Sequence, residues 1–203
     1  MKPRSPDPLM HWGKPLVFAL CLTPFALLEY HAATGEIGPN PVEAVTHATG
    51  DWALRLLLVT LAVTPLRWLT GRGWLLRFRR MLGLFAFFYV SLHFLAYAWV
   101  DQRFDLHYIL EDIVERPYIT IGFLALVLLI PLAATSNKRM VRRLGKRWKK
   151  LHRLVYPIAI LGVWHYCWLV KADLLQPLIY AGILTFLLLY RVPWRVASKA
   201  RSY

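Results

Sequence analysis

Six long apolar stretches alternate with short polar segments along nearly the whole chain. Each stretch is close to the roughly 17–25 residues that an α-helix needs to cross the hydrocarbon core of a bilayer. We therefore predict an all-α fold, a polytopic membrane helical bundle with six transmembrane helices. The predicted spans are about 12–30, 52–69, 81–100, 117–135, 154–171 and 174–192.

The segments between the spans are short and polar. The loop 31–51 carries Gly-Pro and Asn-Pro turn signals, and Asp51 at its end is spaced to pair with Arg55 one helical turn later. The loop 101–116 is acidic, and its stretch LHYILEDIVE predicts a short helix. Because no repeat and no long soluble segment interrupts the pattern, we predict one domain over residues 1–203.

Charge is distributed unequally between the two sides of the predicted bundle. The chain is 58% hydrophobic and carries a formal net charge of +14. Of its 25 Lys and Arg residues, 21 fall in alternate connections and at the two ends, whereas ten of the eleven acidic residues fall on the other side. The positive-inside rule makes the basic side cytoplasmic, so both termini are predicted to face the cytoplasm. Charge placed next to membrane lipid in this way does not predict nucleic acid as a partner.

The first apolar stretch has one competing interpretation, a cleaved signal peptide with Lys2 and Arg4 as its basic start. Pro15 and Pro24 interrupt its apolar region, and Ala32 with the alanine after it gives a poor cleavage site. We therefore interpret it as a span.

Two histidines lie deep inside apolar stretches. His93 follows Arg80 by 13 residues and His165 follows Arg153 by 12, which places both roughly 18–20 Å from their basic ends. An imidazole in hydrocarbon marks a functional site by default, and two at equal depth suit the two axial ligands of one haem. The chain has no C-x-x-C-H motif, so any haem would be non-covalent and of b type. Nearby aromatic side chains are candidates for its walls: Phe94, Tyr97, Trp164 and Tyr166.

A second haem site is left open by the sequence. His152 lies at the cytoplasmic edge, where an interfacial role and a ligand role fit equally. The third span offers no histidine at that depth, and Met81 is the only other common haem ligand there. Three arginines at the start of this span could hold a flavin phosphate or haem propionates, although charge that fixes topology explains them as well: Arg77, Arg79 and Arg80.

With these residues in view, the chain resembles one family, the haem-binding membrane subunits of bacterial periplasmic methionine-sulfoxide reductase systems (the MsrQ/YedZ family). This family lies within the ferric-reductase-like transmembrane group. Each matching stretch is short, but together they run in order across nearly the whole chain. The stretches are THATG (46–50), TPL (64–66), RRMLGL (79–84), LHFLAY (92–97), RPYITIG (116–122), AATS (133–136), LGKRW (144–148), LHRLVY (151–156), WHY (164–166) and QPLIYAG (176–182).

The resemblance implies a b-haem electron-transfer subunit in the bacterial inner membrane. It would pass electrons from the respiratory quinone pool, or from reduced flavin, to a soluble periplasmic molybdopterin reductase that repairs methionine sulfoxide. FMN and a cytosolic flavin reductase are also associated with the family. By motif, its important histidines fall on His93, His152 and His165, and its arginines on Arg79 and Arg80. The sulfoxide chemistry would belong to the partner, so no catalytic residue is expected in this chain.

Two functions from other classes stay open at the level of sequence. One is a stand-alone transmembrane ferric or quinol reductase, and the other is a non-redox membrane scaffold or transporter. The chain has no H-E-x-x-H motif, no pair of E-x-x-H motifs and no cluster of carboxylates inside a span. These absences weigh against a membrane metalloprotease, a di-iron oxygenase and an ion-coupled transporter.

Overall fold

The computed structural model describes residues 8–170 and 174–191, and most of the basic residues that the sequence places at the two ends, such as Lys2 and Arg201, lie outside this part. Every regular element in the described residues is helical. The α-helices are α1 (Pro8–Thr34), α2 (Pro41–Thr70), α3 (Leu76–Leu95), α4 (Leu106–Glu115), α5 (Pro117–Ala134), α6 (Lys138–Leu144), α7 (Lys146–Leu151), α8 (Val155–Leu169) and α9 (Leu175–Leu189). Two 3₁₀ turns, η1 (Gly73–Leu75) and η3 (His152–Leu154), and one π-helical segment, η2 (Ala96–Asp101), join them.

The second helix begins well before the position that apolar content predicts. The predicted loop 31–51 shrinks to residues 35–40, because α1 continues to Thr34 and α2 begins at Pro41. Asn40 caps α2, since its side chain accepts from the backbone N–H of Glu43, and a proline suits the first helical position. These polar capping signals start a helix that is still outside the apolar stretch.

The predicted short helix and the predicted ion pair are both confirmed. The stretch LHYILEDIVE forms α4, and Arg55 Nη2 lies 3.0 Å from Asp51 Oδ2. Asp112 fixes α4 in place: its carboxylate accepts hydrogen bonds from the Tyr97 hydroxyl and from the Gln102 amide, both at 2.9 Å.

The chain is a multi-pass helical membrane protein. Four segments of the described residues are long and apolar enough to cross a membrane: Trp12–Thr34, Pro41–Thr70, Gly73–Val100 and Pro117–Ala134. The last two predicted spans correspond to α8 and α9, which have 15 residues each. Fifteen residues fall short of the roughly 17 that a span needs. Within the described residues, four of the six predicted spans therefore have a helix of full length.

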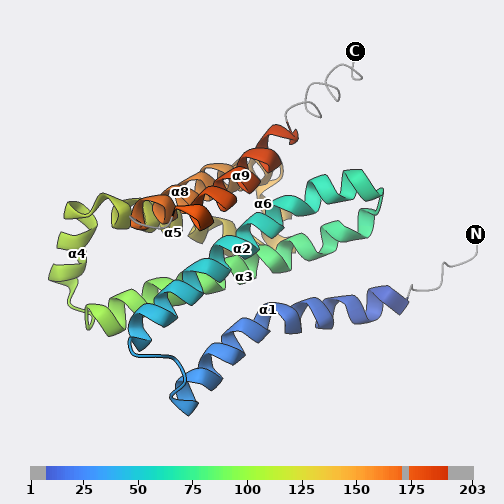
Figure 1. Cartoon of the computed structure of the whole chain (residues 1–203). Coiled ribbons are helices and arrows are strands. Elements are labelled where there is room, and N and C mark those ends of the chain that lie inside the picture. Colours follow the sequence, from blue (N-terminus) through green and yellow to red (C-terminus); the bar gives the residue numbers. More distant parts are fainter. Residues whose placement is uncertain (1–7, 171–173, 192–203) are drawn as a thin grey trace, which may run out of the picture.

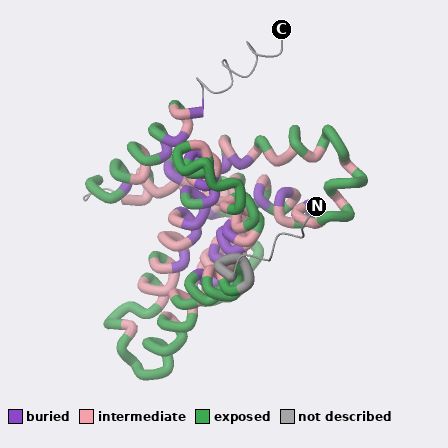
Figure 2. Tube along the Cα trace, turned by 90° about the vertical axis from the view of Figure 1, so that its right-hand side faces the viewer, coloured by how far each residue is buried: buried purple, intermediate pink, exposed green. Residues whose placement is uncertain are grey.

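The core lies where α2 meets α3 and where α5 meets α8 (Figure 1). Buried residues concentrate on these central helices, whereas the outlying segments are exposed (Figure 2). The largest fully buried side chains include Leu61 of α2, Tyr89 of α3 and Ile158 of α8. The core is almost entirely apolar, as expected when backbone groups are already satisfied within helices.

Helix α1 packs differently from the others. It passes through Pro15 and Pro24 without ending, so the prolines do not divide the first apolar stretch. The hydroxyl of buried Tyr89 inserts into its hydrogen-bond ladder, accepting from the Phe25 N–H at 3.0 Å and donating to the Cys21 carbonyl at 2.9 Å. Such an insertion is a known cause of helix bending. The contact joins α1 to α3 at one buried point.

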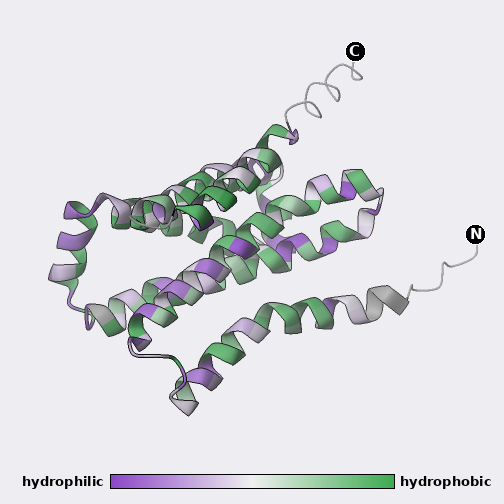
Figure 3. Ribbon diagram, viewed as in Figure 1, coloured by the Kyte–Doolittle hydropathy of each residue, from purple (hydrophilic) through white to green (hydrophobic). Residues whose placement is uncertain are grey.

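Both ends of the bundle are polar, and the helices between them are mainly hydrophobic. The α2–α3 turn lies at the end where α1 begins and α9 finishes, and α4 lies at the opposite end (Figure 1). Hydrophilic residues gather around that turn and in α4, while α5, α8 and α9 are mainly hydrophobic (Figure 3). Gly71 allows the turn, because it closes α2 in the left-handed conformation, with φ of 68°.

Candidate functional site

The structure brings His93 of α3 and His165 of α8 together. Their ring centroids are 6.0 Å apart, and the two ring planes cross at 82°. We call these two residues the histidine pair. They come from helices 72 positions apart along the chain, so the matched depth expected from the sequence becomes a direct contact in space.

Each ring of the histidine pair is held by a backbone carbonyl. His93 Nδ1 lies 2.8 Å from the carbonyl oxygen of Thr46 in α2, and His165 Nδ1 lies 2.7 Å from that of Tyr118 in α5. A carbonyl oxygen only accepts, so each Nδ1 carries the proton and donates it. Each imidazole is therefore oriented in a defined tautomer with Nε2 as its free lone pair, the form in which histidine binds metals.

The spacing of the pair fits one metal ion between the two rings. Two metal–imidazole bonds of about 2 Å, with each ring centre roughly 1 Å further back, would separate the centroids by about 6 Å. No group of three or more His, Cys, Asp or Glu side chains suited to a metal occurs in the described part of the chain. A metal held by the pair would then take its other ligands from a bound group, as haem iron takes four from its porphyrin.

Some aromatic residues near the pair pack between helices, whereas Trp164 faces outward. Phe94 packs against Phe123 of α5, with ring centroids 5.8 Å apart, and the Tyr118 ring lies 6.4 Å from that of His165. Trp164 was a candidate wall, but this is wrong: its side chain is exposed and stacks on Trp168 at 5.8 Å. Adjacent residues on a helix point about 100° apart, so the neighbour of His165 faces outward.

Tyr97 and Tyr166, the other two candidate walls, take part in polar contacts. Tyr97 donates to Asp112 of α4, and the Tyr166 ring lies 5.8 Å from Tyr180 of α9. Tyr180 also accepts a hydrogen bond of 2.8 Å from Arg55 Nε. The Asp51–Arg55 pair is thus extended across α2 to α9, a contact that the sequence did not indicate.

A second site lies toward the basic end of the bundle. A cavity of about 790 Å³ opens between α2, α3, α5, α6, α7 and α8, and we call it the basic pocket. This size falls within the roughly 300–1,000 Å³ of cofactor and ligand sites. Its walls are apolar, and six cationic side chains line it: Arg79, Arg80, Lys138, Arg142, Lys149 and Arg153.

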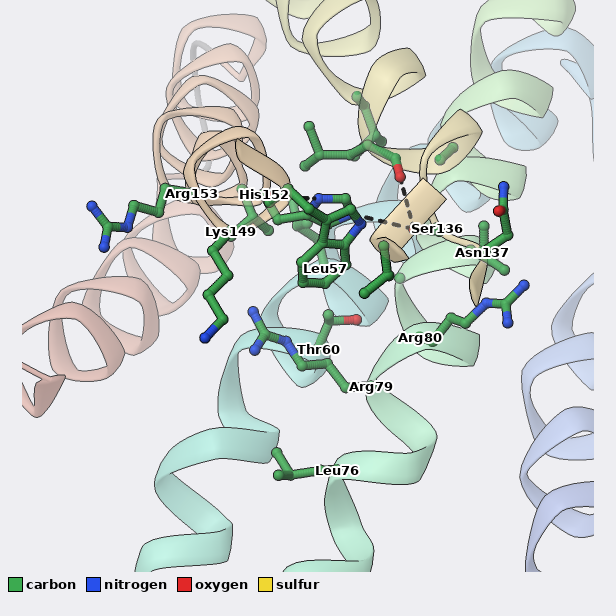
Figure 4. A pocket seen from close by; sticks show the side chains of 18 of the residues that line it. Leu57, Thr60, Leu76, Arg79, Arg80, Ser136, Asn137, Lys149, His152 and Arg153 are labelled. Atoms are coloured by element: carbon green, nitrogen blue, oxygen red, sulfur yellow. Dashed lines mark hydrogen bonds between the residues drawn. The ribbon is translucent and has the colours of Figure 1, made fainter. Parts of the chain in front are cut away.

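The arginines at the start of α3 separate into two kinds. The α3 residues that line the pocket are spaced i, i+3, i+4, i+7 and i+8, which is one face of a helix. They are Leu76, Arg79, Arg80, Gly83 and Leu84. Arg79 and Arg80 therefore both line the basic pocket, whereas Arg77 is not among the lining residues. Figure 4 shows Arg79 below His152, with Arg80 extending away from the centre.

His152 lines the basic pocket and is held loosely (Figure 4). Its ring stacks on Trp148 with centroids 3.9 Å apart, Nδ1 lies 3.2 Å from the Trp148 carbonyl, and Nε2 lies 3.5 Å from Ser136 Oγ. Burial, with a smaller contribution from the positive charge of Arg79, lowers the pKa of His152 below its ordinary value. This shift favours the neutral form of the ring.

No second common haem ligand accompanies His152 in the pocket. Its lining contains no other histidine and no methionine, and Met81 packs against the apolar core instead. His152 also lies apart from the histidine pair: it is the first residue of the 3₁₀ turn η3, which precedes α8, and His165 lies 13 residues further along the chain. Three further histidines are exposed, as expected from their places at the predicted boundaries: His31, His47 and His107.

Comparison with known proteins shows the family to which the chain is similar. Residues 49–163 match the family model described as "Ferric reductase like transmembrane component", a range that includes His93 and His152 and stops just before His165. No solved structure matches the chain significantly.

Curated relatives cover almost the whole chain. A protein of Rhodospirillum rubrum is 56% identical over 89% of this chain and 87% of its own length. A protein of Herminiimonas arsenicoxydans is 52% identical over 93% of this chain and 88% of its own length. One from Xanthomonas campestris pv. campestris (strain 8004) is 52% identical, with 94% of this chain and 89% of the relative covered. All three are named protein-methionine-sulfoxide reductase heme-binding subunit MsrQ. With this identity along most of its length, the chain belongs to the MsrQ/YedZ family of haem-binding subunits, within the ferric-reductase-like transmembrane proteins.

Proposed function

We propose that the chain is a b-haem electron-transfer subunit whose histidine pair supplies both axial ligands. The observation that carries this proposal is the pair itself: two imidazoles, each bonded at Nδ1 to a carbonyl, with ring centroids 6.0 Å apart. A bound haem would supply one-electron oxidation and reduction. The residues of the chain would orient both ligands, surround the group with apolar helices and so set its reduction potential.

The basic pocket is the proposed place where electrons enter. Its volume, apolar walls and cationic lining suit an amphiphilic, anionic redox group, either FMN or a second b-haem with His152 as its only protein ligand. Arg79 and Arg80 would bind phosphate or carboxylate groups, as arginine does through charge-assisted hydrogen bonds. The reductant would be quinol from the respiratory pool or reduced flavin from a cytosolic flavin reductase.

The proposed topology gives the transfer a direction. With six spans and both termini in the cytoplasm, the basic pocket lies on the cytoplasmic side of the bacterial inner membrane. The histidine pair and α4 then lie toward the periplasm. Electrons would leave at the pair and pass to a soluble molybdopterin reductase that reduces methionine sulfoxide in oxidised periplasmic proteins. The names of the relatives, which refer to a methionine-sulfoxide reductase, support such a partner.

A haem stoichiometry tests the proposal. Protein purified from haem-replete cells should contain b-type haem by the pyridine haemochrome assay, at one haem per chain or two if the basic pocket also binds haem. A folded protein with no Soret absorption would contradict the proposal and favour a non-redox scaffold or transporter.

One alternative has an observation in its favour, since the matching family model is that of ferric reductases. A stand-alone ferric reductase would reduce iron chelates at a rate independent of any periplasmic protein. We expect slow chelate reduction that competes with transfer to the partner. Rapid chelate reduction that the partner does not slow would favour the alternative.

A further inference from the structure

Helices α2 and α5 hold the two histidines in the same way. In α2, the carbonyl of Thr46 bonds to His93, and Gly50 follows four residues later. In α5, the carbonyl of Tyr118 bonds to His165, and Gly122 follows four residues later. Residues four apart lie on one face of a helix, so each imidazole rests between a carbonyl and a glycine on a single face.

Each glycine leaves a space that the imidazole fills. A Cβ added at Gly122 would lie 2.8 Å from His165 Nδ1, and one added at Gly50 would lie 3.0 Å from His93 Nδ1. In both cases the nearest atom is the nitrogen that donates to the carbonyl. A methyl group at either position would therefore push Nδ1 away from the helix and strain its hydrogen bond to the carbonyl.

We propose that Gly50 and Gly122 are positioning residues that fix the planes and the Nδ1 hydrogen bonds of the two axial imidazoles. The proposal rests on the proposed haem at the histidine pair. The glycines let the rings approach the helix backbone, and the carbonyls then hold the ring planes at 82° to one another. Hydrogen bonding at Nδ1 makes an imidazole a stronger electron donor to a metal, which favours the oxidised state.

This arrangement has a spectroscopic consequence. Low-spin ferric haem with nearly perpendicular axial imidazoles gives a highly anisotropic electron paramagnetic resonance signal, whereas parallel imidazoles give a rhombic one. The parent protein should give the anisotropic signal. Gly122→Ala should shift the largest g value toward the rhombic type and raise the midpoint potential, because the ring turns and its hydrogen bond lengthens.

The same substitutions should also weaken haem binding. Loss of an outer partner of a metal ligand typically lowers affinity by roughly 10- to 100-fold, and haem transfer to excess apomyoglobin would measure the loss here. Gly122→Ala should have the larger effect and Gly50→Ala the smaller, because the added Cβ is closer to the ring at Gly122. If the Gly122→Ala protein does not accumulate, the spectrum and the haem affinity of Gly50→Ala test the proposal instead.

Two matched controls lie in the same bundle. A Cβ at Gly162, on the same helix as His165, would meet only Leu54 Cδ1 at 3.6 Å, an ordinary contact, and at Gly182 nothing lies within 4 Å. Gly162→Ala and Gly182→Ala should therefore keep the parent spectrum and the parent haem affinity. Equal behaviour of all four alanine variants would overturn the proposal while leaving the haem site itself intact.

A haem-free measurement separates positioning from a general packing role. Alanine is favoured over glycine inside a helix, so Gly122→Ala is harmful only if the imidazole occupies the space. In a His165→Ala background, adding Gly122→Ala should leave the melting temperature of the haem-free protein unchanged or raise it. An equal drop in melting temperature with and without the His165 imidazole would contradict the proposal.

Discussion

The histidine pair and the basic pocket hold their imidazoles in different ways. The pair is fixed by two backbone hydrogen bonds of 2.8 and 2.7 Å. His152 instead borders a wide cavity lined by six cations, and its nitrogens lie 3.2 and 3.5 Å from their partners. A site with rigidly held ligands suits a permanently bound group that must keep its geometry through many electron transfers. A wide cationic cavity suits an anionic group or donor that binds more loosely.

The orientation of these two ends in the membrane gives an all-or-none prediction. Once the native Cys21 and Cys167 have been replaced, single cysteines at Glu43 and Glu111 should react with a membrane-impermeant thiol reagent on intact spheroplasts. Cysteines at Arg72 and Lys146 should react only after permeabilisation. All four positions are exposed, so accessibility reports the side of the membrane. Labelling of Arg72→Cys from outside would contradict the proposed orientation, in which the basic pocket faces the cytoplasm.

Removing either member of the histidine pair should abolish the main haem signal. His93→Ala and His165→Ala each leave one axial ligand, and low-spin haem needs two strong ones. Optical and electron paramagnetic resonance spectra of the purified variants would measure the loss. Exposed His107 offers a control, because His107→Ala should keep the parent spectrum. A normal low-spin spectrum in His93→Ala would mean that the pair does not bind haem.

Removing His152 should leave the main low-spin signal unchanged and should affect only the basic pocket. His152→Ala should remove any second haem component, or slow reduction by quinol analogues and reduced flavin, because its ring lines the cavity. Exposed Arg147 lies in the same basic segment but outside the lining, so Arg147→Ala is a suitable control. Loss of the main signal in His152→Ala would show that the two sites are not separate.

The cationic lining should have the smallest effect, and only on charged donors. Fields from clustered charges raise association rates about tenfold or more, so Arg79→Gln should lower the rate of reduction by reduced FMN roughly tenfold. Arg77→Gln should change this rate less, since Arg77 does not line the cavity. Stopped-flow measurements with a neutral quinol analogue provide the control, because its rate should not depend on Arg79. An equal effect on both donors would point to a structural role for this arginine.

Much of this arrangement can be predicted from the sequence, because the membrane restricts it. Helices must satisfy their own backbone, so apolar length predicts the spans, and flanking charge gives the depth of His93 and His165. The start of α2 was missed because Asn40 and Pro41 begin a helix outside the apolar stretch. Capping residues, rather than apolar residues, determine where this helix begins.

Other features depend on which way a side chain faces. Arg77 was grouped with Arg79 and Arg80 by proximity in sequence, although about 200° of helical turn separates Arg77 from Arg79 and Arg77 does not line the cavity. The carbonyl–glycine spacing that holds each histidine was visible as T-x-x-x-G and Y-x-x-x-G. The role of this spacing is evident only once α2 is known to pack against α3 and α5 against α8, and hydropathy does not predict these contacts.

The direction of electron flow is the central claim, and one reconstitution tests it most directly. The haem-loaded chain would be reduced in liposomes by a quinol analogue or by reduced flavin, and its reoxidation followed by absorbance. Reoxidation should need both the periplasmic reductase and methionine sulfoxide, because the proposed relay assigns the sulfoxide chemistry to that reductase. Rapid reoxidation by methionine sulfoxide alone would make the chain a reductase in its own right and contradict the relay.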